Sequence, residues 1–156
     1  MNTVIFDDKY FMRIAIKEAQ KAYEQNEIPI GAVIVWNNKI IGKGYNQTEI
    51  LQDPTAHAEI IAITAATQNL GAKYLQQASL YVTVEPCIMC IGAIYWAKIK
   101  RIVWATAEPK TGFWQFETII NNYKKSFLNP KTEISYGILE NEAKELLQNF
   151  FKLKRK

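Results

Sequence analysis

Side chains that bind transition metals are scarce in this chain of 156 residues, and they fall in two short motifs. Its single histidine, His57, lies in His57-Ala58-Glu59, and its two cysteines, Cys87 and Cys90, lie in Pro86-Cys87-Ile88-Met89-Cys90. A structural zinc site usually has four histidine or cysteine ligands, whereas a catalytic site has three protein ligands and leaves one position for water. The count therefore predicts a catalytic zinc site, and the fold must bring the two motifs together.

The length and composition are those of one ordinary globular domain. With 49% hydrophobic residues the chain can bury a core without disulfides, so we expect a single domain over residues 1–156. No stretch approaches the roughly 20 apolar residues of a membrane-spanning helix, and residues 1–8 lack the pattern of an export signal. Two cysteines three residues apart suit a reducing compartment. We expect a cytoplasmic protein that needs no membrane.

Positive charge is concentrated at the C-terminal end. The net charge is +4, and residues 152–156, Lys-Leu-Lys-Arg-Lys, contain four basic groups. Without them the 19 lysines and arginines would fall to 15 and equal the 15 acidic residues. A localised basic tail is attracted to a phosphate backbone, although a solvated terminus that aids solubility has the same composition.

Helical and strand patterns alternate along the chain. Helices are expected at 9–25, 56–69, 87–97 and 139–152, and strands at 30–36, 39–44, 79–84, 101–105 and 132–136. Asn37-Asn38 joins the first two strands as a hairpin, because asparagine tolerates the positive φ of a tight turn. Such alternation predicts a mixed, partly parallel sheet with helices on both faces.

Both metal motifs lie at the start of an expected helix. His57 and Glu59 fall in the first turn of one helix, and the two cysteines, three residues apart, project from one face at the start of the next. A helix N-terminus favours the thiolate form of a cysteine, because it places partial positive charge beside the sulfur. The spacing and the electrostatics therefore agree with a metal site.

The predicted site suits hydrolysis. Zinc lowers the pKa of a bound water, and Glu59, two residues from His57, can take and return protons without being a ligand. A lone Cys-x-x-Cys is also typical of a redox pair or of two buried small side chains, and a lone His-x-Glu arises by chance. Redox chemistry gives no role to His57 and Glu59, so the combination favours the hydrolytic interpretation.

The order His-x-Glu, then Pro-Cys-x-x-Cys, is the signature of zinc-dependent nucleobase deaminases. The similarity extends to further segments at 29–33, 44–46, 53–60, 80–87, 110–112 and 150–151: Pro-Ile-Gly-Ala-Val, Gly-Tyr-Asn, Asp-Pro-Thr-Ala-His-Ala-Glu-Ile, Leu-Tyr-Val-Thr-Val-Glu-Pro-Cys, Lys-Thr-Gly and Phe-Phe. With these segments the chain resembles the bacterial tRNA-specific adenosine deaminases over nearly its whole length.

This resemblance implies a fold, a reaction and partners. The fold would be a cytidine-deaminase-like three-layer α/β/α sandwich around a five-stranded mixed sheet. The protein would be a homodimer with one zinc ion per subunit, bound by His57, Cys87 and Cys90. It would convert adenosine to inosine at the wobble position of a tRNA anticodon, with no role for DNA. Zinc-activated water would add to C6 of the adenine while Glu59 protonates N1, after which Glu59 helps ammonia to leave.

The same resemblance places seven further residues at the substrate: Asn46, Ile30, Ala58, Pro86, Lys110, Phe150 and Phe151. Asn46 would hold the flipped nucleoside with Ile30 packed beside it, while the phenylalanines stack on bases and the basic tail meets phosphates. Structural roles are open for several of these side chains. Asn46 could stabilise a turn, Ile30 could fill the core, and helical spacing predicts that at least one of the two phenylalanines is buried.

Residues 108–130 depart from the family pattern. Glu108-Pro109 replaces an expected Asp-Ala pair, and Gly112-Phe113-Trp114-Gln115-Phe116 replaces small residues. These aromatic side chains could stack on bases, reshape the pocket or cover the sheet.

Two other functions compete with tRNA editing. One is a free-base or nucleoside deaminase of the same superfamily, acting on guanine, cytosine or a modified purine. The other is a noncatalytic RNA-binding module stabilised by its metal. The basic tail, Asn46 and Lys110-Thr111-Gly112 favour tRNA over a free base. Glu59 favours an enzyme, because a structural metal site gains nothing from an acid that is not a ligand.

Overall fold

The strands of the computed structural model form one five-stranded sheet in the order β2-β1-β3-β4-β5. The structure describes residues 5–115, 117 and 128–155. Residues 116 and 118–127 of the divergent segment 108–130, and Lys156 of the basic tail, therefore lie outside the described residues. The strands are β1 (Gly31–Trp36), β2 (Lys39–Tyr45), β3 (Ser79–Val84), β4 (Arg101–Thr106) and β5 (Glu133–Tyr136). The helices are α1 (Asp8–Glu24), α2 (Ala58–Leu70), α3 (Ile88–Ala97) and α5 (Glu140–Lys154). Each expected boundary lies within two residues of the observed one.

The sheet is mixed, as the sequence predicts. β1 runs antiparallel to its neighbours β2 and β3, whereas β3, β4 and β5 run parallel to one another. The first pair is a hairpin whose turn residues, Asn37 and Asn38, have φ angles of 53° and 60°. The carboxyl ends of the three parallel strands therefore meet at one end of the sheet.

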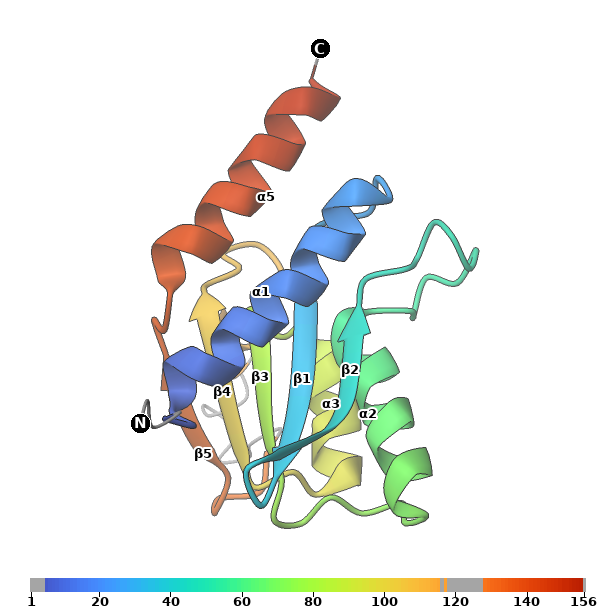
Figure 1. Ribbon diagram of the computed structural model, residues 1–156, viewed down its shortest axis with the longest axis vertical. Helices are drawn as coiled ribbons and strands as arrows, with labels where there is room; N and C mark the ends of the chain where they lie inside the picture. Colours follow the sequence, from blue (N-terminus) through green and yellow to red (C-terminus); the bar gives the residue numbers. More distant parts are fainter. Residues whose placement is uncertain (1–4, 116, 118–127, 156) are drawn as a thin grey trace.

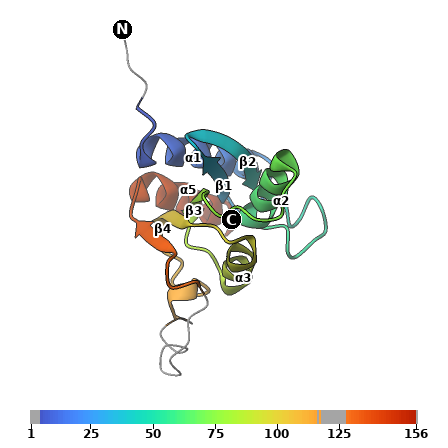
Figure 2. The same ribbon diagram turned by 90° about the horizontal axis from the view of Figure 1, so that it is seen from below.

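Helices cover both faces of the sheet, which confirms the α/β/α sandwich (Figures 1 and 2). α1 and α5 lie on one face, over a core that includes Val33, Tyr81 and Val103. α2 and α3 lie on the other face, over a core that includes Ile34 and Leu80. Alternate residues of each strand thus face alternate layers. None of the helices in the described part of the chain has the length and apolarity to cross a membrane.

Small residues bring α2 unusually close to β2. A Cβ atom added to Gly42 would lie 2.5 Å from the Ala62 carbonyl oxygen, and one added to Gly44 would lie 2.5 Å from that of Ala58. Only glycine permits such an approach of strand to helix backbone. The close packing fixes the N-terminus of α2 beside the end of β2, and this placement positions the site described below.

An ion pair ties α1 to the strands. Asp8 accepts hydrogen bonds from Arg101 Nη1 at 2.7 Å and Nη2 at 2.8 Å, and another from the Tyr81 hydroxyl at 2.7 Å. Arg101 also donates to the Ser135 hydroxyl at 3.0 Å. The Arg101 guanidinium, with the Tyr81 hydroxyl, holds the pKa of the Asp8 carboxyl below its usual range. One carboxylate thus links α1 to β3 and β4.

We expect Asp8→Asn to lower the free energy of unfolding at pH 7 by about 1.5–3 kcal/mol, the range for hydrogen bonds to charged groups. The Asp8 pKa is lower in the folded than in the unfolded state. Its contribution is therefore complete above about pH 4, the ordinary aspartate pKa, and is lost as the pH falls through the lower folded pKa. Urea unfolding of wild type and variant at several pH values measures this difference. Exposed Glu24→Gln at the end of α1 is the control, and an equal loss in both variants would contradict the prediction.

Candidate metal centre and active site

The three predicted metal ligands lie at the N-termini of two helices. His57 is the N-cap of α2 and Cys87 is the N-cap of α3, both with extended backbone, and Cys90 follows in the first turn of α3. The helices therefore begin one or two residues later than the sequence suggests. Neither N-cap side chain makes a capping hydrogen bond, so both are available to bind a metal.

The donor atoms have the spacing that one zinc ion requires. His57 Nδ1 lies 3.6 Å from Cys87 Sγ and 3.5 Å from Cys90 Sγ. All three donor atoms lie within 4.8 Å of one another. With Zn–N distances of about 2.0–2.1 Å and Zn–S distances of about 2.3 Å, tetrahedral geometry places nitrogen and sulfur about 3.6 Å apart. Three such donors fit a catalytic zinc site.

The two thiols differ in acidity. Contact with the Cys90 thiol, aided by His57, lowers the pKa of the Cys87 thiol to about 4. The pKa of the Cys90 thiol is raised, because it interacts with Cys87 and because it is buried. The pKa of His57 is raised, chiefly by its contact with Cys87. Zinc binds thiolates, so zinc binding releases the protons that the thiols hold.

Glu59 brings a buried acid to the metal donors. Its side chain lies in the first turn of α2 and is only 4% exposed. Burial raises the pKa of its carboxyl, and the neighbouring Cys90 opposes this shift. A carboxyl with a raised pKa can both accept and donate a proton near neutral pH.

Two predicted substrate residues lie beside this cluster. The Asn46 N–H donates to the Ile30 carbonyl at 3.0 Å, and the next residue, Gln47, donates to the Ala56 carbonyl, also at 3.0 Å. These bonds hold Ile30 and Asn46 close to the start of α2. Asn46 is 4% exposed, and no described residue hydrogen-bonds its side-chain amide. Its amide is therefore available to a ligand.

Other predicted residues border the cluster by their place in the chain. Ala58 and Pro86 are buried next to His57 and Cys87, and Lys110 is exposed in the loop after β4. The backbone N–H of Lys110 donates to Glu108 Oε1 at 2.9 Å.

Glu85 organises the loop after β4, a role that no sequence pattern indicated. It is 6% exposed and accepts the N–H groups of Glu108 at 3.2 Å and Trp114 at 3.1 Å. The next residue, Pro86, accepts the Phe113 N–H at 3.0 Å. Cys87 itself forms an isolated β-bridge with Gly112. Residues 108–114 are thus tied to the segment that carries the metal-binding cysteines.

We expect Gly112→Ala to loosen this loop and to destabilise the protein by about 1–3 kcal/mol, the usual cost of overpacking. The added Cβ would meet Glu85 Oε2 and lie 2.5 Å from the Glu108 carbonyl oxygen. Gly92→Ala is the matched control, because nothing lies within 4 Å of its added Cβ. Inside helix α3, that control should be neutral or stabilising by about 0.5–1 kcal/mol. Thermal and urea unfolding compare the two, and equal stabilities would contradict the role of Glu85.

The closing helix separates the two predicted phenylalanines. Phe150 is 6% exposed and packs edge-on against Tyr23 of α1 at 6.1 Å, whereas Phe151 is 42% exposed. This confirms that at least one is buried, and Phe151 is the exposed one of the pair.

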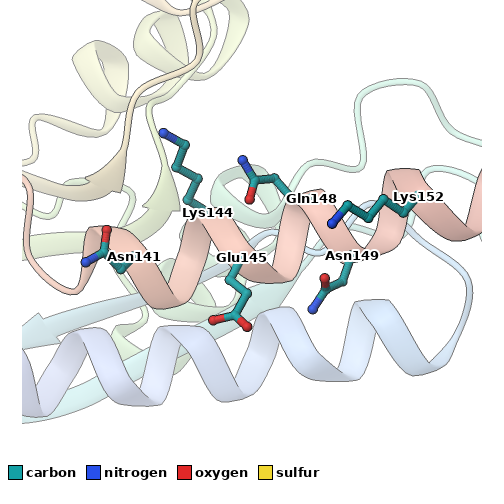
Figure 3. A pocket seen from close by; sticks show the side chains of 6 residues that line it. All are labelled: Asn141, Lys144, Glu145, Gln148, Asn149 and Lys152. Atoms are coloured by element: carbon teal, nitrogen blue, oxygen red, sulfur yellow. The ribbon is translucent and has the colours of Figure 1, made fainter.

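The outer surface of α5 carries a shallow polar hollow of about 480 Å³ (Figure 3). The residues that line it are Asn141, Lys144, Glu145, Gln148, Asn149 and Lys152. In Figure 3, Glu145 and Asn149 point towards α1, and Lys144 and Gln148 point away from it. The hollow contains none of the metal donors, but its two lysines, Lys144 and Lys152, lie on the helix that runs into the basic tail.

Comparison with known proteins identifies the family. Residues 6–106 match the cytidine and deoxycytidylate deaminase zinc-binding region. The chain is 42% identical over 144 residues to a tRNA-specific adenosine deaminase of Aquifex aeolicus, covering 92% of this chain and 93% of that one. It is 41% identical over 149 residues to the Bacillus subtilis protein of the same description, covering 96% and 91%. A solved structure from work on A-to-I editing by tRNA:A34 deaminases superimposes with a TM-score of 0.79 at 38% identity, covering 88% of this chain and 99% of that one. The chain therefore belongs to the cytidine and deoxycytidylate deaminase family and, within it, to the tRNA-specific adenosine deaminases.

Proposed function

We propose that this chain uses one zinc ion per subunit to hydrolyse adenosine to inosine at the wobble position of a tRNA anticodon. The observation that carries the proposal is the buried carboxyl of Glu59 beside three metal donors, in a chain of the tRNA-specific adenosine deaminase family. A noncatalytic module would have no use for a buried acid in this position.

The residues of the site have distinct roles in this reaction. His57, Cys87 and Cys90 hold zinc, which when bound supplies Lewis acidity and an activated water for hydrolysis. Glu59 takes a proton from the attacking water and passes it to N1 of the adenine as C6 accepts the oxygen. It then takes the remaining proton of that oxygen and delivers it to the amino group, so that ammonia leaves and inosine remains. The raised pKa of the buried carboxyl suits this two-way transfer.

The adenine binds beside this carboxyl. The free amide of buried Asn46 hydrogen-bonds the flipped nucleoside, and Ile30 packs beside it. Ala58 and Pro86 border the same pocket, since each lies next to a metal ligand in the chain.

The rest of the RNA meets the loop after β4 and the closing helix. Exposed Lys110 and the basic groups of α5, Lys144 and Lys152 among them, contact phosphates, and Phe151 stacks on a base. The C-terminal half of α5 projects beyond the carboxyl end of the sheet, the end at which the metal donors lie (Figure 1). The single domain thus presents its basic tail towards a ligand at the site.

The protein works as a cytoplasmic homodimer in this proposal. α3 exposes 47% of Tyr95 and 74% of Trp96, which is more apolar surface than a short helix usually leaves in water. Sedimentation at micromolar concentration tests this part, and a purely monomeric species would contradict it.

The decisive experiment offers zinc-loaded protein an anticodon stem-loop with adenosine at the wobble position, alongside free adenosine, cytidine and guanine. Inosine and ammonia from the stem-loop alone are the expected result. A stem-loop with the adenosine moved by one position is the matched control and should remain unmodified. Turnover of a free base or nucleoside instead would keep the reaction but identify the protein as a free-base or nucleoside deaminase. No turnover of any substrate would overturn the proposed reaction.

A further inference from the structure

Four aromatic rings gather where the parallel strands end. Trp104 of β4 stacks on Tyr136 of β5 at 5.7 Å and 18°, and Phe113 stacks on Trp114 at 5.6 Å and 24°. Trp114 also meets Trp104 at 6.1 Å and Tyr136 at 6.5 Å, in both cases edge-on. The cluster is therefore continuous from the sheet to the loop after β4.

The four rings differ sharply in exposure. Trp104 and Phe113 are 2% and 1% exposed, whereas Trp114 and Tyr136 are 43% and 66% exposed. The inner pair covers the sheet, and the outer pair presents ring surface to solvent from a rigid base. Exposed tryptophan held in this way is typical of a binding surface.

This surface lies at the same end of the sheet as the metal donors. The cysteines follow β3, Trp114 follows β4, and Tyr136 ends β5, in register with Trp104. Because these strands are parallel, all three segments leave the sheet at one end, where α/β proteins usually bind ligands. β5 is two strands from β3, a separation of about 10 Å. Figure 2 shows the segment after β4, in orange, on the side of the sheet opposite α1.

Hydrogen bonds fix Trp114 relative to the site. Its backbone N–H donates to Glu85 Oε2 at 3.1 Å, and the backbone N–H of Phe113 donates to the Pro86 carbonyl at 3.0 Å. Both acceptors immediately precede Cys87. The backbone of Trp114 is therefore fixed relative to the metal donors before a ligand arrives, which lowers the entropic cost of binding.

We infer that Trp114 and Tyr136 form a platform on which an unpaired base next to the target adenosine stacks. The inference rests on the proposed function, because it requires a single-stranded RNA segment at the metal site. Proteins that recognise unpaired RNA stack its bases on aromatic rings, largely without regard to sequence. Exposed Lys110, four residues before Trp114, is placed to meet the phosphate of such a nucleotide.

Stem-loop deamination by Trp114→Ala, with Trp36→Ala as control, tests the platform. Trp36 is also 43% exposed but ends β1, which runs antiparallel to β3 and so points to the other end of the sheet. We expect Trp114→Ala to raise KM about tenfold or more while kcat and zinc content stay unchanged. Trp114→Phe should recover most of the loss, and Trp36→Ala should behave as wild type.

Substrates that lack one base identify the partner of the platform. Stem-loops with an abasic site on the 5′ or the 3′ side of the target adenosine are compared in both proteins. On one of the two abasic substrates, the KM of wild type should rise to the value that Trp114→Ala shows on the intact stem-loop. The KM of Trp114→Ala should be the same on that abasic substrate as on the intact stem-loop. Tyr136→Ala, at an exposed strand end, should give the same pattern and serves in place of Trp114→Ala if that variant does not fold.

Several outcomes would overturn the platform. They are an unchanged KM, a KM increase that persists on both abasic substrates, or an effect on self-association without an effect on KM. If wild type makes no inosine from the stem-loop, the proposed function fails and the platform fails with it. If wild type is active and Trp114→Ala equals it, only the platform fails.

Discussion

Glu59→Gln is expected to retain zinc and fold and to lose deamination by about 10²–10⁴-fold, the usual contribution of a positioned acid–base group. Glutamine has nearly the same volume as glutamate, so the buried position next to Cys90 stays filled. Its amide cannot accept a proton from water and deliver it to the adenine. Single-turnover inosine formation, with zinc content measured on the same sample, separates loss of chemistry from loss of metal.

The matched control for this prediction is Glu18→Gln. Glu18 is also 4% exposed, but it lies on α1, across the sheet from the metal donors, and pairs with Lys21 at 2.7 Å. We expect this variant to lose some stability and to keep wild-type kcat. A Glu59→Gln protein with zinc and full activity would refute the assignment of Glu59 as the proton carrier.

Cys87→Ala is expected to lose zinc and therefore activity. Activity should fall by more than roughly 100-fold, the upper end of the usual loss when a residue that supports a metal ligand is replaced. Cys87 is half-buried at the helix N-cap, so its removal leaves little cavity, and two donors remain. A site with two protein donors binds zinc more weakly than a site with three, so a chelator removes zinc from the variant more easily. Metal analysis after dialysis and the zinc dependence of Tm measure the loss, since a ligand at about 1,000 times its Kd adds roughly 4 kcal/mol of stability.

Met89→Ala tests whether a substitution anywhere in the first turn of α3 is enough to cause the loss of zinc. Met89 stands between the two cysteines and offers no thiolate, so its variant should keep zinc and the zinc-dependent rise in Tm. Stoichiometric zinc in Cys87→Ala would contradict the assigned ligand set.

Local signals made much of the fold predictable. Asn37 and Asn38 both adopt positive φ, as a two-residue hairpin turn demands, and this conformation depends on little beyond these residues. The metal donors were equally predictable, because the chain has only three histidine and cysteine side chains and each lies at the start of a helix. In both cases a residue type and a short spacing carry the information.

Features that depend on distant segments were not predictable. In the sequence, Glu85 is only the residue that follows a strand. Its role depends on hydrogen bonds from Glu108 and Trp114, which lie 23 and 29 positions further along the chain. The pairing of Asp8 with Arg101 spans 93 positions. Helical spacing predicted that one of Phe150 and Phe151 is buried, but only the packing of α5 on α1 decides which. Likewise, the sequence left open whether the aromatic residues after β4 cover the sheet or face solvent, and the structure assigns Phe113 to the first role and Trp114 to the second.

The two helix N-termini that supply the metal donors also define a closed loop. His57 and Cys87 are 30 positions apart, and the segment between them contains α2 and β3. In polymer terms, a zinc ion that stays bound during unfolding acts as a cross-link and removes conformations from the unfolded chain. A covalent cross-link closing a loop of this length is worth about 3–4 kcal/mol on the chain-entropy scale. The supply of zinc would then affect how long each molecule survives proteolysis, as well as how fast it turns over substrate.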